Sequence, residues 1–252
     1  MIMDVLTVRD LCKTYPAFSL KNASFSVEEG SIMGFIGRNG AGKSTTLKSI
    51  LHLVHPDSGE VTLFGKSFEE NEAYIKQNIG VVLGGIDFYP KKKVGVITDV
   101  TRRFYSQWDE EKYRHYLELF AIDEAKRVDQ LSSGMRVKYM IALALSHQAR
   151  LLILDEPTSG LDPVSRDELT ELFKRIVADG RRSILFSTHI TSDLEKCATH
   201  ITFIKDGTIL QSGTAAQFMD VYRSLAQPGK PLTLEDIIVS VERRPYDEGA
   251  II

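Results

Sequence analysis

Residues 37–44 read GRNGAGKS, and this stretch decides the fold of the 252-residue chain. The pattern of Gly, four residues, Gly, Lys and Ser is that of a phosphate-binding P-loop. The run before it, residues 31–36, is short and apolar, as a buried strand is. The run after it, residues 43–54, repeats apolar side chains at helical intervals up to Val54. Strand, Gly-rich loop and helix is the context that this motif requires, and it argues against an ordinary Gly-rich turn.

The loop residues predict how phosphates would be held. Glycines let the backbone curl so that successive N–H groups point at phosphate oxygens, and the helix behind adds the positive end of its dipole. The lysine would neutralise the β- and γ-phosphates, and the serine hydroxyl would ligate Mg²⁺. The nucleotide-binding residues expected here are Gly37, Arg38, Asn39, Gly40, Ala41, Gly42, Lys43, Ser44 and Thr45, with Ser44 also a metal ligand.

Composition indicates an ordinary soluble globular protein, with 43% hydrophobic and 26% charged residues. The formal net charge of −3 argues against a nucleic-acid partner. Cys12 and Cys197 lack metal or redox spacing, which favours two reduced core thiols in a cytosolic protein. No apolar run reaches the roughly 18 residues of a membrane helix, and the start of the chain lacks a signal-peptide pattern, so we expect a soluble chain.

Strands and helices alternate along the chain, which predicts an α/β fold with a largely parallel core sheet. Weakly alternating strands near the start would form a small antiparallel layer. The middle of the chain has little strand signal and predicts an inserted helical subdomain at about 85–149. We expect one domain at 1–232, then a C-terminal helix and tail at 233–252. The predicted helices are 68–77, 96–106, 110–121, 134–147, 163–178, 192–197, 214–225 and 234–241.

A second apolar strand, residues 151–154, ends in two acids, Asp155 and Glu156. The turn at 157–160 follows directly, at the sheet edge where α/β folds bind ligands. Asp155 would hold Mg²⁺, directly or through water. Glu156 would orient and deprotonate a water molecule, which is much of what phosphoryl transfer requires.

Two further stretches have both a structural and a functional interpretation. Leu131-Ser-Ser-Gly-Met135 reads by itself as a helix N-cap, and a capped helix start is also an anion site. If it faced a second protomer, it could grip that protomer's γ-phosphate. His189 ends the strand at 183–188; such a residue is more often packed or at the surface, but its proton could also report on a γ-phosphate.

Taken together, these stretches resemble the ATP-binding subunits of ABC transporters over roughly residues 4–220. GRNGAGKS resembles the Walker A motif, LLILDEP the Walker B motif and LSSGM the LSGGQ signature. SGLD at 159–162 is similar to the D-loop, and His189 to the switch histidine. Tyr15, which lies 22 residues ahead of Gly37, has the place of the adenine-stacking aromatic residue.

The resemblance implies a P-loop NTPase core of the RecA type with a mostly parallel sheet, an antiparallel β subdomain and an α-helical insertion. It implies an ATPase that uses ATP and Mg²⁺, on the cytoplasmic side of a membrane. Two subunits, identical or related, would close on two ATP molecules and drive a membrane-spanning permease. Ser132 and Gly134 would contact the ATP bound by the other subunit, and Asp162 would couple the two sites. Lys43, Glu156 and His189 would be the catalytic residues.

Two departures from the family pattern affect the site. The family's Gln after the strand at 79–83 is replaced by Gly84-Gly85, near the expected permease-docking region at 84–100. In the signature, Ser133 and Met135 replace a Gly and a Gln, as in divergent bacterial exporters. Two alternatives stay open: a soluble ABC-type ATPase acting on ribosomes or DNA, and a nucleotide-sensing regulatory subunit with weak hydrolysis.

Overall fold

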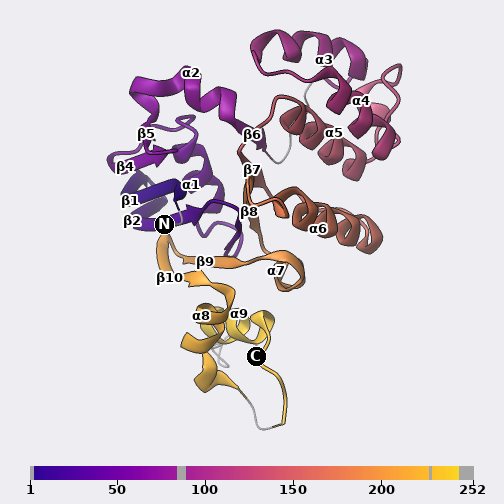
Figure 1. Cartoon of the computed structure of the whole chain (residues 1–252). Helices are drawn as coiled ribbons and strands as arrows, with labels where there is room; N and C mark the ends of the chain where they lie inside the picture. Colours follow the sequence, from indigo (N-terminus) through magenta and orange to yellow (C-terminus); the bar gives the residue numbers. More distant parts are fainter. Residues whose placement is uncertain (1–2, 84–88, 227–228, 244–252) are drawn as a thin grey trace.

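The structure, a computed structural model, describes residues 3–83, 89–226 and 229–243 (Figure 1). It contains a six-stranded sheet, in the order β10-β9-β3-β8-β7-β6, and a four-stranded sheet, in the order β2-β1-β4-β5. The α/β class with a mostly parallel core sheet is therefore confirmed. Gly84, Gly85 and the first residues of the expected permease-docking region lie outside the described residues.

The larger sheet forms the core because its strands are apolar on both faces. The neighbours β6 (Ile79–Val82), β7 (Leu151–Asp155), β8 (Ser183–Thr188), β3 (Ile32–Ile36) and β9 (His200–Lys205) all pair in parallel. Every residue of β3, β7 and β8 is buried. The strand β10 (Thr208–Thr214) closes one edge as an antiparallel hairpin with β9. Parallel strands present their carboxyl ends at one edge, so the segments that follow β3, β7 and β8 meet there.

The smaller sheet is antiparallel, as predicted for the early strands. Its strands are β1 (Asp4–Tyr15), β2 (Phe18–Glu28), β4 (Ser58–Leu63) and β5 (Lys66–Ser67). The helix α1 (Lys43–Ile50) places Leu47 and Ile50 in one apolar cluster with residues of both sheets. The two sheets and α1 therefore share a core, and the β1–β2 turn comes close to the start of α1.

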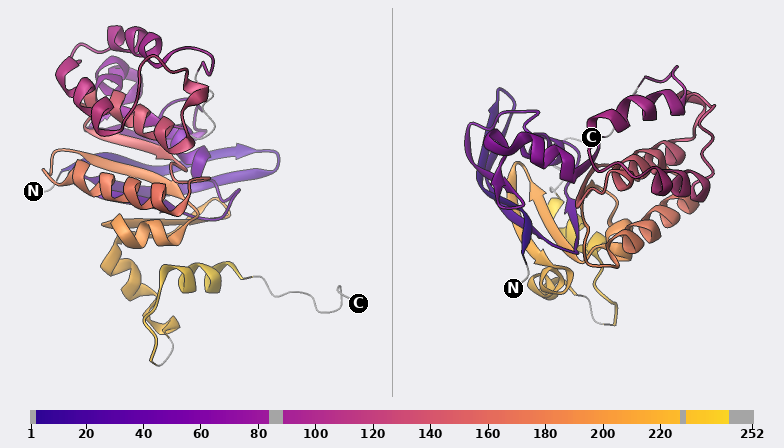
Figure 2. Two further views of the ribbon diagram at one scale, coloured as in Figure 1. Left: turned by 90° about the vertical axis from the view of Figure 1, so that its right-hand side faces the viewer. Right: turned by 45° about the horizontal axis from the view of Figure 1, so that its top comes forward.

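Three helices form the subdomain that the sequence predicts: α3 (Val94–Thr101), α4 (Glu110–Leu119) and α5 (Ser133–Ser146). They share an apolar cluster, α5 also packs into the core cluster with α6, and the three helices stand apart from the antiparallel sheet (Figure 2). Gln77, at the end of α2 (Phe68–Asn78), joins this unit to the core, since its amide accepts from Ser106 N at 2.9 Å and donates to Phe104 O at 2.6 Å.

The C-terminal helices lie on the face of the core sheet opposite α1, where α5 also packs. These are α6 (Pro163–Val177), α7 (Thr191–Cys197), α8 (Ala215–Val221) and α9 (Leu234–Glu242). Leu234 and Ile237 of α9 are buried in the same cluster as α6 and β8. The proposed division of the chain at residue 232 stays a prediction.

Several predicted boundaries were wrong. The helix after the P-loop ends at Ile50 instead of residue 54, because His52 takes a left-handed conformation with φ of 55°. The segment predicted as a helix at 96–106 is α3 followed by a 3₁₀ turn, Arg102–Phe104, and that at 214–225 is α8 followed by a 3₁₀ turn, Arg223–Leu225.

Cys12 is only half-buried, whereas Cys197 is a core thiol, and both are free. Among the described residues, no helix has the length and apolar character to cross a bilayer.

Candidate nucleotide-binding site

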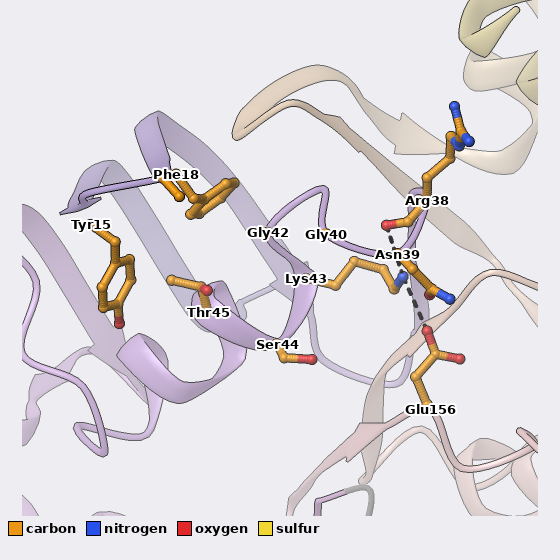
Figure 3. Close-up of a pocket in the computed structure, with 11 residues that line it drawn as sticks. Tyr15, Phe18, Arg38, Asn39, Gly40, Gly42, Lys43, Ser44, Thr45 and Glu156 are labelled. Carbon is orange, nitrogen blue, oxygen red and sulfur yellow. Dashed lines mark hydrogen bonds and ion pairs between the residues drawn. The ribbon is translucent and has the colours of Figure 1, made fainter.

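The P-loop connects β3 to α1 and curls around an open cavity of about 410 Å³ (Figure 3). Gly40 and Gly42 take positive φ values of 83° and 114°, which L-residues rarely adopt. Among the described residues, α1 has no side-chain cap, and its first N–H groups have no partner within the helix. The cavity is lined by Tyr15, Ala17, Phe18, Arg38, Asn39, Gly40, Gly42, Lys43, Ser44, Thr45 and Glu156.

On the side away from the cavity, two glycines of the loop lie in close contact with neighbouring residues. A Cβ on Gly37 would lie 2.3 Å from Ile204 O, and a Cβ on Gly42 would lie 2.7 Å from Phe18 Cζ. The turn between β9 and β10 supports the loop, since Gly207 N donates to Ala41 O at 3.0 Å. The same glycine accepts from Lys21 N of β2 at 2.8 Å. The P-loop is thus held between the two sheets, with its open side facing the cavity.

Lys43 is the buried cation of the site, with 5% of its side chain exposed. Its ammonium donates to Gly37 O at 2.8 Å and to Arg38 O at 3.4 Å. It also lies 3.1 Å from Glu156 Oε1. Because carbonyl and carboxylate oxygens surround this ammonium, phosphate oxygens could take the place of some of them.

Glu156 lies between Lys43 and His189, so the structure brings together the three residues predicted as catalytic. Its backbone has φ of 50°, and its N–H donates to Ser187 Oγ at 2.9 Å. This conformation directs the carboxylate to the cavity. Oε2 lies 2.8 Å from His189 Nδ1. Oε1 has no hydrogen-bond partner among the described residues, because the contact with Lys43 is an ion pair without hydrogen-bond alignment. Oε1 is thus buried beside the Lys43 ammonium and has no other polar partner among the described residues.

Asp155 lies at the end of β7, buried, and accepts a hydrogen bond from Ser187 Oγ at 2.5 Å. Its carboxylate and the Ser44 hydroxyl of the cavity wall are hard oxygen donors, the type that Mg²⁺ prefers. In the part of the chain that the structure describes, no group of three or more His, Cys, Asp or Glu side chains could hold a metal ion by itself. These two protein oxygens fit a Mg²⁺ ion whose remaining ligands are phosphate oxygens and water molecules, which is the usual way that proteins bind Mg²⁺.

The structure does not bring every predicted residue into the cavity. Among the described residues, the lining does not include the predicted Gly37, Ala41, Asp155 and His189, which lie in or next to the loops around it, nor Ser132, Gly134 and Asp162. Ser132 caps α5 by accepting from Met135 N at 3.2 Å, and Asp162 caps α6 by accepting from Val164 N and Ser165 N at 3.0 Å. These two helix starts are neighbours, because a Cβ on Gly134 would lie 3.6 Å from Ser165 Oγ. They form a second polar group on the same chain.

Three residues of the site were missed by the sequence reasoning: Ala17 and Phe18, which line the cavity, and Ser187. Phe18 lines the cavity opposite Gly42, next to the predicted Tyr15. Ser187 connects Asp155 and Glu156 through its hydroxyl. The sequence could have indicated Ser187, because it is a polar residue at the end of an apolar strand, and such residues often have a role at the sheet edge. Phe18 carried no signal beyond its closeness to Tyr15.

The model of the ABC transporter family matches residues 20–159 of the chain. The bacitracin transport ATP-binding protein of Bacillus licheniformis is 33% identical over 210 residues, which cover 82% of this chain and 69% of that protein. The Nod factor export ATP-binding protein of Burkholderia lata is 32% identical over 195 residues, which cover 75% and 64%. The chain thus spans about two thirds of the length of these relatives.

A solved ATP-binding subunit of an ABC transporter superposes with a TM-score of 0.83 at 25% identity, covering 95% of this chain and 100% of that one. The family model extends beyond the P-loop through the helical subdomain to residue 159, and the fold agrees over 95% of the chain. This chain belongs to the ABC transporter family, as one of its ATP-binding subunits.

Proposed function

We propose that the cavity of this ABC-transporter ATPase holds the triphosphate of ATP against the P-loop, with Glu156 as the general base. The observation that carries the proposal is the position of the Glu156 carboxylate, between the Lys43 ammonium and the His189 ring. A carboxylate beside a cation and an imidazole can hold a water molecule in line with a phosphate that replaces the loop carbonyls around Lys43.

The other residues of the cavity then have defined tasks. The backbone N–H groups of 40–45 and the ammonium of Lys43 would receive the phosphate oxygens. The ring of Tyr15, at the opposite end of the cavity, would stack on the base. His189 would orient the Glu156 carboxylate through its Nδ1 contact.

Ser44 and Asp155 would hold Mg²⁺, which neutralises charge on the phosphates when it is bound. The hydrogen bond from Ser187 fixes one oxygen of Asp155 in place. The same hydroxyl accepts from Glu156 N, so the metal ligand and the base are positioned by one side chain. We therefore propose Ser187 as part of the support of this site.

A second ATPase subunit, a copy or a relative of this chain, would complete the site. Ser132, Gly134 and Asp162 lie at the starts of α5 and α6, and the cavity of the same protomer leaves room for an outside group. Helix starts supply N–H donors suited to a γ-phosphate. This arrangement supports closure of two subunits around two ATP molecules, with Asp162 near the opposite site.

We further propose a membrane-spanning permease as the partner, on the cytoplasmic side of the membrane. The side chains of Val96, Val100 and Phe104 are exposed on α3 and the 3₁₀ turn that follows it. An apolar strip of this kind suits an amphipathic segment of a partner. Relatives named for bacitracin transport and Nod factor export favour export as the direction.

Glu156→Gln tests the proposal. The amide keeps the shape of the side chain but cannot accept a proton, so ATP turnover should fall by about a hundredfold or more. Binding of Mg·ATP, measured by calorimetry, should stay within about threefold of the natural chain. The matched control is Glu118→Gln, on the exposed face of α4, which should leave both quantities unchanged. Unchanged turnover in Glu156→Gln would remove Glu156 as the base.

A further inference from the structure

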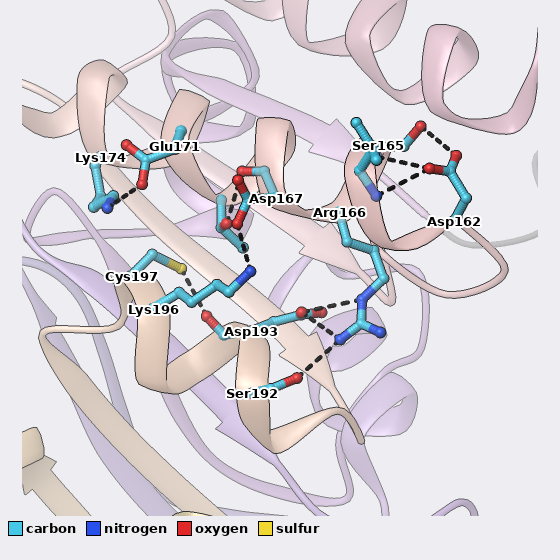
Figure 4. A network of polar contacts seen from close by, with 12 residues as sticks. Asp162, Ser165, Arg166, Asp167, Glu171, Lys174, Ser192, Asp193, Lys196 and Cys197 are labelled. Carbon is cyan, nitrogen blue, oxygen red and sulfur yellow. Dashed lines mark hydrogen bonds and ion pairs between the residues drawn. The ribbon is translucent and has the colours of Figure 1, made fainter.

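The helices α6 and α7 are joined by a polar contact that the sequence motifs do not include (Figure 4). Arg166, in the first turns of α6, donates to Asp193 Oδ1 from Nε at 3.1 Å and from Nη2 at 2.6 Å. Nη2 also donates to Ser192 Oγ at 3.0 Å. One guanidinium therefore holds two consecutive residues in the first turn of α7.

This contact is buried, unlike the other link between the same helices. The side chain of Asp193 is 2% exposed and that of Arg166 is 23% exposed. The neighbouring pair, Lys196 with Asp167, is 46% and 57% exposed. Exposed pairs contribute little, whereas breaking a buried pair by removing one partner is costly. Arg166 is thus the stronger constraint on how α7 sits against α6.

The position of α7 decides where His189 lies. Only His189 and Ile190 separate the end of β8 from Thr191, the first residue of α7. The β8 end is fixed in the sheet, and Ile190 N is bound to Thr188 Oγ1 at 3.0 Å. Within the described residues, α7 has no side-chain cap of its own. The direction of the His189 segment therefore depends on what holds α7, and Arg166 holds its first turn by side-chain contacts while the buried Leu194 anchors the helix in the core.

Arg166 is also connected to the starts of α5 and α6, the second polar group of the chain. Arg166 N donates to Asp162 O at 3.0 Å, and Asp162 also binds Ser165 Oγ at 2.6 Å. Ser165 in turn lies against Gly134 at the start of α5. A continuous series of contacts thus runs from the starts of α5 and α6, through Arg166, to α7 and His189.

The carboxylate of Asp193 is not fully satisfied in this arrangement. Both guanidinium contacts go to Oδ1, and Oδ2 is buried with no hydrogen-bond partner among the described residues. An unpaired buried acceptor is unfavourable, so this pair is not built for maximum stability. Oδ2 is thus an acceptor of the same carboxylate that the Arg166 guanidinium leaves unused.

We propose that Arg166 is a positioning residue that sets the position of His189 relative to Glu156. Through Arg166, the position of His189 depends on the position of the first turn of α6. A subunit docking at Gly134 and Asp162 would in this way adjust the His189–Glu156 contact in the site of the same chain. The inference rests on the proposed roles of His189 and Glu156.

The test compares ATP hydrolysis by the purified 252-residue chain and its variants, at steady state and in single turnovers with protein in excess. Arg166→Lys keeps the charge beside Asp193 but loses the two-nitrogen contact with Asp193 and the added hydrogen bond to Ser192. We expect kcat to fall about tenfold, because a misplaced His189 lowers the rate, while KM stays within about twofold. Asp167→Asn, which removes the exposed link between the same helices, is the matched control and should change neither value.

A double-mutant cycle separates positioning from general support of the fold. If Arg166 acts through His189, adding Arg166→Lys to His189→Ala should lower kcat by less than about twofold beyond His189→Ala alone. A second variant, Ser192→Ala, leaves the ion pair intact and should lower kcat about threefold with an unchanged unfolding temperature.

Three results would overturn the inference: a kcat for Arg166→Lys equal to that of the natural chain, an equal loss in Asp167→Asn, or losses that multiply in the double variant. Failure of the proposed function has a different signature, because His189→Ala would then leave kcat unchanged. If Arg166→Lys does not fold, Ser192→Ala decides, and an unchanged kcat in that variant rejects the positioning role.

Discussion

Lys43 shows how one residue can prepare a site for an anion. A lysine ammonium is strongly hydrated, so its burial must be compensated by oxygen acceptors. Here the acceptors are two carbonyls of its own loop and a carboxylate that carries the opposite charge. An incoming phosphate would compete with these oxygens for the ammonium, so binding of the nucleotide and release of Glu156 from its ion pair are coupled.

His147 gives a prediction at the same scale, on stability instead of turnover. It follows α5, is 3% exposed, and stacks on the Tyr105 ring with centroids 3.7 Å apart. Burial lowers the pKa of His147 from 6.5 to about 4, partly offset by hydrogen bonds to the backbone. The unfolded chain therefore binds a proton more readily between these pH values. The free energy of unfolding should fall from pH 6.5 to pH 4, by roughly 3 kcal/mol at the lower end.

Urea unfolding of the natural chain and of His147→Phe, at steps of pH, measures this effect. Phenylalanine keeps a planar ring against Tyr105 and cannot take up a proton. The difference in unfolding free energy between the two chains should change through this pH range and level off below about pH 4. Other titrating groups contribute equally to both chains. Equal pH dependence in both would show that His147 is protonated as easily in the folded chain as in the unfolded one.

At the scale of elements, the sequence predicted best where burial and periodicity coincide. The apolar runs that became β7 and β8 were identified because a central parallel strand is apolar on both faces, and the run of the edge strand β6 is apolar as well. The end of α1 was wrong because Leu51 and Val54 continue the helical period into a turn. The spacing of apolar residues does not indicate that His52 takes a left-handed conformation.

The site was predictable to the extent that it lies in contiguous motifs. The P-loop, Glu156 and His189 each follow a strand and Asp155 ends one, and parallel strands bring such positions together. The contact between Arg166 and Asp193 joins residues 27 positions apart in two helices. No sequence pattern around either residue indicates that the other is its partner, so the contact is seen only in the packing of α6 on α7.

The β9–β10 turn supports the P-loop, and two glycines offer a comparison that isolates this support. Gly207 and Gly65 both occupy turns with similar φ values, 79° and 71°. A Cβ on Gly207 would lie 1.8 Å from Ser19 O, whereas a Cβ on Gly65 has no atom of the described residues within 4 Å. Gly65→Ala should therefore cost only the left-handed conformation, about 1–2 kcal/mol.

Gly207→Ala should cost several kcal/mol more, on the order of 3–5 in total, because the turn must move away from β2. It should also weaken binding of ATP by about tenfold, since the hydrogen bond from Gly207 to the P-loop is lost. Urea unfolding and calorimetry measure the two effects. Equal losses in the two variants would show that the turn does not support the loop.

At the scale of the whole molecule, the polar groups that suit a triphosphate lie in two places. The cavity holds the P-loop and Glu156, and the starts of α5 and α6 hold Ser132, Gly134 and Asp162. A single chain cannot apply both sets to one nucleotide without rearrangement. Two chains facing each other with opposite orientation could pair each cavity with the other chain's helix starts, a symmetric arrangement of the type that dimers commonly use.

Gly134→Ala tests this arrangement without disturbing the protomer. Gly134 is the second residue of α5, and a Cβ there would make only ordinary contacts of 3.6–3.8 Å with Ser165 and Leu161. Alanine favours a helix over glycine by up to about 1 kcal/mol, so the free energy of unfolding should stay equal or rise. The added methyl group would instead meet the phosphate bound by the other subunit. In the Glu156→Gln background, where turnover is blocked, ATP should drive association of the chain, and Gly134→Ala should weaken that association about tenfold or more.

The matched control is Gly95→Ala, at the second residue of α3, where a Cβ would lie 3.5 Å from Glu124. It has the same helical position and similar space, but it lies on α3 instead of on the helix starts that would face the second nucleotide. Light scattering at a series of ATP concentrations gives the mass of each variant in solution. Association that is equally strong in Gly134→Ala and Gly95→Ala would mean that the start of α5 does not face a nucleotide. Weakening in Gly134→Ala alone, with an unfolding free energy at or above that of the control, would locate the loss between subunits, since no contact within the protomer could account for it.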